Sequence, residues 1–340
     1  MSKVYFIEQK NASYNELGKS ALALLKTIEA ETNHQFAEKL PIKVHFGEKG
    51  NNTYMPAVCY DAIIEYLKSK NISPTYIETN VLYRGARTTA ESHLKLAIEH
   101  GFNQIPIIFA DGEIGTDYDE IEINKDYIAK CKIGKAYQKY NQYIVMSHFK
   151  GHNAAGFGGA LKQLAMGFAA RGGKFAQHSG ITPIVDAKKC IACGLCMEKC
   201  DFDAIHIDEA AVIDSDKCVG CAGCIAVCPE AAIRNDWGGS NFLEKLAEYA
   251  YGASRHKDII YISFLQNITA DCDCMGQHMD LIADNIGVLA SKDPVALDCA
   301  CLEMLQKKSG QLLFDKGRKS LAHAEKIGLG STRYELIVNE

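Results

Sequence analysis

The sequence is poor in several features that mark particular classes of protein. It has seven prolines and one tryptophan in 340 residues, with 23% charged residues, a composition that excludes a disordered, collagen-like or coiled-coil chain. Basic residues are not in excess, since 37 Lys and Arg face 42 Asp and Glu for a formal net charge of −5. The charge balance therefore predicts no nucleic-acid partner. The 47% of apolar residues suffice for one large or two ordinary hydrophobic cores.

Long apolar runs are missing as well. No stretch approaches the roughly 20 consecutive apolar residues that a membrane helix needs. The opening residues lack the basic flank, apolar stretch and small-residue cleavage site of a secretory leader. We therefore expect a cytoplasmic protein with no membrane partner.

Cysteine, by contrast, is abundant. The chain contains 14 cysteines, and in the cytoplasm such thiols more often bind metal or take part in catalysis than form disulfides. Eight of them form two runs of the pattern C-x₂-C-x₂-C-x₃-C, of which the first begins at Cys190 and the second 28 residues later at Cys218. The duplication predicts two similar short units related by a pseudo-twofold axis.

This spacing resembles that of bacterial ferredoxins with two 4Fe-4S clusters. In those proteins three cysteines of each run bind one cluster and the fourth binds the other. We therefore assign one cluster to Cys190, Cys193, Cys196 and Cys228, and the other to Cys218, Cys221, Cys224 and Cys200. Asp201 stands where the first run would usually have proline, which removes no ligand. Two zinc sites are the alternative for eight thiolates, although zinc motifs usually come as separated pairs. Clusters with only a structural role are a second alternative.

Outside these runs, strand and helix patterns alternate. Short apolar runs predict strands at 3–8, 42–46, 75–79, 106–109, 142–147, 258–264, 286–290 and 334–338. Helical patterns occupy 14–31, 56–69, 89–100, 159–170, 240–250 and 294–307. Such alternation indicates an α/β fold with a largely parallel sheet and flanking helices. It stops near Gly180 and resumes after Asp236, so we predict a discontinuous α/β domain of residues 1–180 and 236–340. A small α+β module with two clusters, residues 181–235, would split it.

A second group of candidate site residues follows the predicted strand 142–147. His148, His152 and Lys162 lie in a glycine-rich segment that leads into a helix, where open α/β sheets bind their ligands. Free N–H groups at the helix start, together with Lys162, favour a small anionic ligand. A flexible connection or close helix packing would explain the glycines equally well.

The segment 271–278 carries a further pair of cysteines. Cys272 and Cys274 point the same way if the segment is extended, and Asp271, Asp273 and His278 surround them. The pattern suits a soft or borderline metal, or a reactive thiol pair. The candidate catalytic residues are therefore Cys272, Cys274, His148, His152 and Lys162. The residues of a candidate third centre, an additional metal or cluster, are Cys272, Cys274, His278, His148 and His152.

Arginines precede the predicted helix 89–100. Arg84 and Arg87 lie just past a strand, where two guanidinium groups could bind a carboxylate or phosphate. The alternative is a capping box of Thr88 and Glu91 with surface arginines. The other four cysteines, Cys59, Cys131, Cys299 and Cys301, have the spacing of core residues or no companion, and we expect them to be structural.

These segments together resemble the domain of unknown function 362 family. The resemblance rests on five segments: His45 to Gly50, Tyr83 to Thr89, Ser147 to Lys162, Asp271 to Cys274, and Asp293 to Asp298. It covers nearly the whole chain, and members often contain a ferredoxin module with two clusters. It implies a shared site of His148, His152, Lys162, Cys272 and Cys274, but the family has no settled activity.

The sequence favours an iron–sulfur protein, and an oxidoreductase among these. Two clusters would pass electrons between a donor or acceptor protein and a site on the α/β domain. The alternative is a binding module that holds a metal or anion and whose clusters are structural. No G-x-G-x-x-G segment follows a strand as flavin or nicotinamide binding would require.

Overall fold

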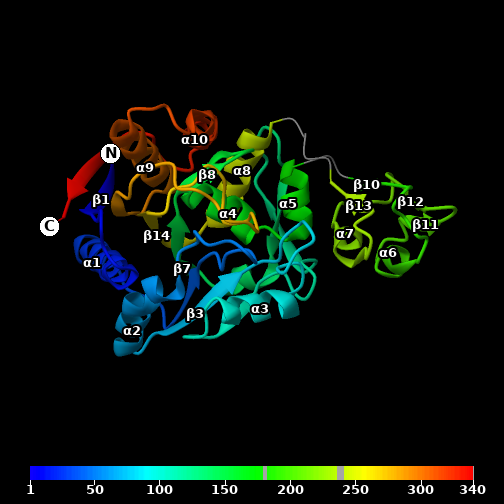
Figure 1. Cartoon of the computed structure of the whole chain (residues 1–340), viewed down its shortest axis with the longest axis horizontal. Coiled ribbons are helices and arrows are strands. Elements are labelled where there is room, and N and C mark those ends of the chain that lie inside the picture. Colours follow the sequence, from blue (N-terminus) through cyan, green and yellow to red (C-terminus); the bar gives the residue numbers. More distant parts are fainter. Residues whose placement is uncertain (179–181, 236–240, 340) are drawn as a thin grey trace.

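A large α/β body and a small lobe make up the protein. The computed structural model describes residues 1–178, 182–235 and 241–339, and Figure 1 shows the small lobe beyond one end of the body. The predicted domain boundaries at 180/181 and at 236 lie outside the described residues, as does the predicted helix start at 240. Among the described residues, none of the helices has both the length and the apolar character needed to cross a bilayer.

The body is built on an eight-stranded sheet with the order β16-β1-β15-β14-β7-β2-β3-β4. In chain order these strands are β1 (Ser2–Glu8), β2 (Lys39–Lys43), β3 (Ser73–Glu78), β4 (Ile107–Phe109), β7 (Gln142–His148), β14 (Asp258–Leu265), β15 (Gly287–Ser291) and β16 (Tyr334–Val338). Only β15 runs antiparallel to its neighbours, and every other pair in this sheet is parallel. The prediction of a largely parallel sheet is confirmed.

Helices cover both faces of this sheet. One face carries α1 (Tyr14–Thr32), α2 (Asp61–Ser69) and α3 (Ala90–Glu99). The other carries α4 (Ala160–Phe168), α8 (Phe242–Ser254), α9 (Pro294–Ser309) and α10 (Arg318–Lys326), and α5 (Arg171–His178) packs on α4 and α8. Short 3₁₀ helices lie at Ala57–Tyr60, Lys135–Lys139 and Asp315–Gly317. The sequence did not predict α5, α10 or the hairpins β5 (Tyr118–Glu122) with β6 (Lys130–Gly134) and β8 (Lys150–His152) with β9 (Gly156–Gly158).

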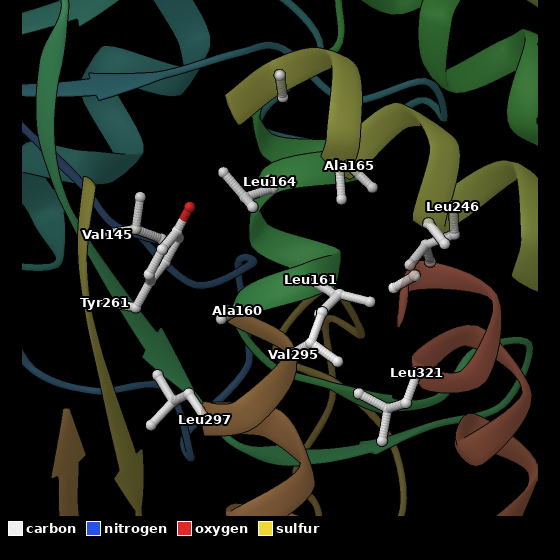
Figure 2. Close-up of a cluster of buried hydrophobic side chains, with 14 of the residues drawn as sticks. Val145, Ala160, Leu161, Leu164, Ala165, Leu246, Tyr261, Val295, Leu297 and Leu321 are labelled. Carbon is white, nitrogen blue, oxygen red and sulfur yellow. The ribbon is translucent and has the colours of Figure 1, made fainter. Parts of the chain in front are cut away.

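The period of two along a strand divides the core into two layers. On β7, Tyr143 and Val145 pack toward α4, α8 and α9, whereas Ile144 and Met146 pack toward α1 and α2. Figure 2 shows the first layer, where Val145 and Tyr261 of the sheet lie beside Leu164 of α4. All four residues of this β7 stretch are almost fully buried, as expected for a sheet that is covered on both faces.

The lobe consists of residues 182–235 and is called the cysteine module below. It contains β10 (Ile184–Val185), α6 (Leu195–Glu198), β11 (Ile205–Ile207), β12 (Ala211–Ile213), α7 (Gly223–Val227) and β13 (Ile233–Arg234). Its backbone repeats: left-handed residues occur at Ala192, Gly194 and Asp203, and again 28 positions later at Gly220, Ala222 and Ala231. The duplicated sequence therefore folds into two similar units.

A buried carboxylate holds the start of α4. Asp298 of α9 accepts hydrogen bonds from the N–H groups of Ala160 and Leu161 at 2.7 and 2.8 Å. A Cβ on Gly159 would lie 2.3 Å from Asp298 Oδ1, so this glycine serves close helix packing. These two N–H groups are consequently not available to an anionic ligand, contrary to our expectation for this helix start.

The cap of α3 also differs from the prediction. Its capping box pairs Thr89 with Ser92, one residue later than the expected Thr88 and Glu91. The hydroxyl group of Thr88 instead donates to the carbonyl of Gly85 at 2.8 Å, in the preceding turn.

Removal of the Asp298 carboxylate should destabilise the body. Asp298→Ala leaves two buried N–H groups without acceptors, and we expect the free energy of unfolding to fall by about 2–4 kcal/mol. Asp298→Asn keeps one oxygen acceptor and should lose less. Urea unfolding of both variants under the same conditions measures the difference, and an Ala variant as stable as the parent would contradict this role.

Candidate functional site

A cavity of about 560 Å³ opens at the carboxyl ends of adjacent parallel strands. The strands β3, β2, β7 and β14 are neighbours in the sheet, and the residues at and beyond their ends line the cavity. The main polar residues of this lining are Glu78, His45, His148, Lys162, Cys272 and Cys274. Open α/β sheets bind ligands at this edge because loops from several strands converge there.

Five sequence-predicted residues meet in this cavity. His148, His152, Lys162, Cys272 and Cys274 all line it, although they come from β7, β8, α4 and the loop after β14. His278 does not belong to the group. Its side chain is 75% exposed, and its Nδ1 lies 2.7 Å from Asn52 Nδ2.

The two cysteines of the cavity form a disulfide. Cys272 and Cys274 are bonded to each other across two sequence positions. Cys272 is only 2% exposed, whereas Cys274 is half-buried. Lys162 Nζ lies 3.6 Å from Cys272 Sγ, and a ring nitrogen of His152 lies within 4.8 Å of both sulfurs. The pair is therefore a disulfide with a cationic neighbour rather than two free ligands.

A buried ionic group supports the cysteine loop. The Asp273 carboxylate lies 3.0 Å from His148 Nδ1 and 2.8 Å from Lys150 Nζ. Burial alone would raise the pKa of Asp273, but His148 and Lys150 outweigh it and hold this pKa well below its usual range. His148 Nε2 also lies 2.6 Å from the carbonyl oxygen of Gln266. Both ring nitrogens thus face oxygen atoms of the protein, so His148 supports the loop and neither nitrogen is free to bind a metal in the cavity.

Arg87 takes part in a second buried group. Its Nε donates to Glu48 at 3.1 Å, and its Nη1 lies 2.8 Å from His45 Nε2. Burial and the neighbouring Arg87 lower the pKa of His45 well below its usual value. Arg84 is exposed and takes no part in this group. The two arginines therefore do not form the joint anion clamp considered from the sequence.

Two lysines on helices also line the cavity. Burial, followed by the neighbouring Lys150, lowers the pKa of Lys162 to about 7. Lys174 on α5 also lines the cavity and bonds to Thr79 Oγ1 and the carbonyl of Ala169, both at 2.6 Å. Sequence reasoning missed Lys174 because its helix was not predicted. Lys150 could have been found, since it shares a face with His148 in an extended segment.

The eight cysteines of the duplicated runs surround two small cavities of the cysteine module. One cavity is lined by Cys190, Cys193, Cys196 and Cys228, and the other by Cys200, Cys218, Cys221 and Cys224. These are the same two groups of four that we assigned from the spacing. What they bind stays a prediction at this point. The four cysteines expected to be structural, Cys59, Cys131, Cys299 and Cys301, are all buried in the body.

The cysteine module packs directly on the wall of the large cavity. A Cβ on Gly172 of α5 would lie 2.6 Å from the carbonyl oxygen of Gly220 and 2.9 Å from Cys221 Cα. Leu82 lines the large cavity and also belongs to the hydrophobic cluster around Cys196 and Phe175. The loop that carries Cys218 to Cys224 therefore abuts the wall of the candidate site. Nothing in the sequence pattern marked Gly172 or Leu82 for this role.

Loss of the Asp273 charge should destabilise the protein at neutral pH. Asp273→Asn leaves His148 and Lys150 without their buried partner, and we expect a loss of about 3–5 kcal/mol. Since the folded-state pKa is depressed, this stabilisation is present above the unfolded-state pKa of about 3.9 and is lost as the pH falls through it toward the folded-state value. Unfolding free energies at several pH values should therefore converge for parent and variant in acid. Asp280→Asn, on a fully exposed neighbour, is the control, and a pH-independent difference for Asp273→Asn would contradict the charge pairing.

Comparisons with solved structures found distant similarities. Two solved structures are similar to the chain, a Thermotoga maritima protein (TM-score 0.46, 9% identity) and the lactate racemase apoprotein from Thermoanaerobacterium thermosaccharolyticum (TM-score 0.37, 12% identity). The alignments cover 90% and 76% of this chain but only 60% and 51% of those chains. None of the curated proteins matches the sequence.

A family model provides the assignment. The model for "Domain of unknown function (DUF362)" matches residues 41–303, which include the cavity residues and the cysteine module but neither β1 nor β16. The chain therefore belongs to the DUF362 family.

Proposed function

We propose that this protein is an iron–sulfur oxidoreductase. In this proposal the cysteine module binds two 4Fe-4S clusters and exchanges electrons with a substrate held in the 560 Å³ cavity. The observation that carries the proposal is the position of the Cys218–Cys224 loop, which abuts Gly172 and the Leu82 side of the cavity wall. Electron transfer requires such proximity between a redox centre and its substrate.

The cysteine module fits two clusters in its donor atoms and their surroundings. Each small cavity is lined by four cysteines, and four thiolate sulfurs in one place repel one another unless cations lie between them. Backbone N–H groups also point at cysteine sulfurs: Ala211 donates to Cys190, Ala204 to Cys200 and Ala232 to Cys228, at 3.3 to 3.4 Å. Bound clusters would take up and release single electrons at potentials that burial and such hydrogen bonds tune.

An exposed apolar surface supports an electron-carrier protein as the partner. Cys193 is exposed, and Ile191, Leu195 and Met197 around it are exposed as well, Ile191 to 62%. These residues surround the first cluster site, away from the loop that abuts the body. Apolar side chains gathered on a surface favour contact with another protein. We propose that electrons enter or leave here.

The charges of the cavity favour a small anionic substrate. Arg87, Lys150, Lys162 and Lys174 line it, against Glu78, Asp271 and Asp273. A net positive cavity raises the local concentration of anions.

The test is metal and sulfide analysis of anaerobically purified protein, with Mössbauer and EPR spectra before and after dithionite. We expect about eight iron and eight sulfide per chain, with spectra of two reducible cubane clusters. Cys221→Ser should abolish the signals of the second cluster. Cys59→Ala, which removes a buried thiol of the body, should leave the signals of both clusters unchanged.

Two outcomes would contradict the proposal. Zinc in place of iron would exclude redox chemistry in the module. Iron clusters that dithionite cannot reduce would instead favour a binding module with structural clusters.

A further inference from the structure

We propose that Cys272 and Cys274 are a redox-active dithiol–disulfide couple that reduces a small anionic disulfide bound in the cavity. The two sulfurs line the cavity wall, beside the lysines that favour an anion. This couple would act within the proposed function. It rests on the proposed function only for its source of electrons, the clusters of the cysteine module. It assigns a reacting group and a substrate class to the cavity.

The position of the bond in the sequence argues against a structural disulfide. A disulfide stabilises a fold mainly by closing a loop of the unfolded chain, and its effect grows with the length of that loop. Cys272 and Cys274 are only two positions apart, so their bond restrains very little of the unfolded chain. The surrounding loop is already held by other bonds. Glu48 N–H donates to the carbonyl of Asp273 at 2.9 Å, and Tyr83 Oη to that of Cys274 at 3.1 Å.

The surroundings stabilise the reduced pair. Lys162 Nζ lies 3.6 Å from Cys272 Sγ, and the N–H group of Cys274 lies 3.4 Å from the same sulfur. A nearby cation and a backbone donor favour a thiolate over a thiol. The Asp273 carboxylate between the two cysteines is salt-bridged, so contacts other than the disulfide also hold the loop.

The two cysteines differ in access. Both cysteines line the cavity, but Cys274 is half-buried, whereas Cys272 is only 2% exposed and its Sγ lies 3.6 Å from Lys162 Nζ. This difference assigns first attack to Cys274 and the resolving step to Cys272.

The reaction balances as two thiol–disulfide exchanges. The Cys274 thiolate attacks one sulfur of the substrate, whose S–S bond breaks and releases the first product thiolate. The Cys272 thiolate then attacks Cys274 Sγ, so the mixed disulfide breaks, the second product thiolate leaves and the Cys272–Cys274 bond forms. Two electrons pass to the substrate, and the products take up two protons from water. Two electrons and two protons restore the dithiol. A low-potential one-electron carrier protein supplies the electrons one at a time through the cysteine module.

The test is differential alkylation of anaerobically purified holoprotein in dithiothreitol redox buffers, read by mass spectrometry of the peptide that contains residues 272 and 274. We expect the pair to open and close reversibly. Lys162→Met should slow alkylation of the reduced pair at pH 7 about tenfold, because loss of a neighbouring cation raises a thiol pKa by about one unit. Lys162→Arg should restore the rate. Lys316→Met, at the carbonyl of Asn153 on the cavity rim, should not change it.

Substrate charge is tested with two probes. Dithiodiglycolate carries two carboxylates and cystamine carries two ammonium groups, and the anionic probe should oxidise the reduced pair faster in the parent. Lys162→Met should make the oxidation rates with the two probes more similar. Faster oxidation of the reduced pair by cystamine would contradict an anionic disulfide as the substrate.

Two outcomes would contradict the assignment of Cys272 and Cys274 as a redox-active couple. The pair would be structural if it stayed oxidised in excess dithiothreitol. It would be a metal site if it were purified reduced, with a metal that His152 helps to bind and that blocks alkylation. Dithiothreitol reduces the pair directly, so failure of the cluster proposal leaves this test intact.

Discussion

Parallel pairing of four adjacent strands is the constraint on which the candidate site depends. In the register of β3, β2, β7 and β14, all four carboxyl ends reach the same edge of the sheet. His45, His148 and Asp273, which are far apart in the sequence, thereby line one cavity. Any pairing that reversed β7 would place His148 at the opposite edge, away from the cysteine loop. The backbone hydrogen bonds of the sheet thus determine which side chains can react together.

Ion pairs are buried beside the cavity at this edge of the sheet. Asp273 with His148 and Lys150, and Glu48 with Arg87, are removed from water at a cost that pairing only partly offsets. Replacement of a buried ion pair by apolar residues of similar volume is often neutral or even stabilising in proteins. Both groups contact the loop of Cys272 and Cys274, since Asp273 belongs to this loop and the N–H group of Glu48 donates to the Asp273 carbonyl. The cysteine module lies across the cavity wall, where α5 and Leu82 separate it from that loop.

Periodicity and spacing predicted those parts of the structure that depend on local sequence. The strand expected at 142–147 is Gln142–His148, and the helix expected at 14–31 is Tyr14–Thr32, because alternating and helical apolar patterns reflect which faces are buried. The spacing of the duplicated runs grouped the eight cysteines as the two small cavities do. The iron–sulfur clusters themselves, and the chemistry of the cavity, remain proposals.

Features that depend on tertiary contact escaped prediction. Helix α5 contains Gly172 and Gly173, which lower helix propensity, yet any side chain there would strike Gly220 of the cysteine module or the carbonyl of Lys132. Arg87 turns inward to Glu48 whereas Arg84 stays exposed, a difference that sequence pattern does not encode. The spacing of Cys272 and Cys274 left a metal site and a thiol pair equally open, and only their position in the fold shows them bonded.

In the proposed reaction, electrons pass from the cysteine module to the disulfide of the cavity. A reductive titration of anaerobic, air-oxidised holoprotein tests it most directly, with electron equivalents counted by coulometry and thiols at residues 272 and 274 by mass spectrometry. We expect an uptake of about four electron equivalents per chain, two for two clusters and two for the disulfide, with new thiols at both positions. Uptake that stops at about two equivalents with the disulfide intact would contradict it.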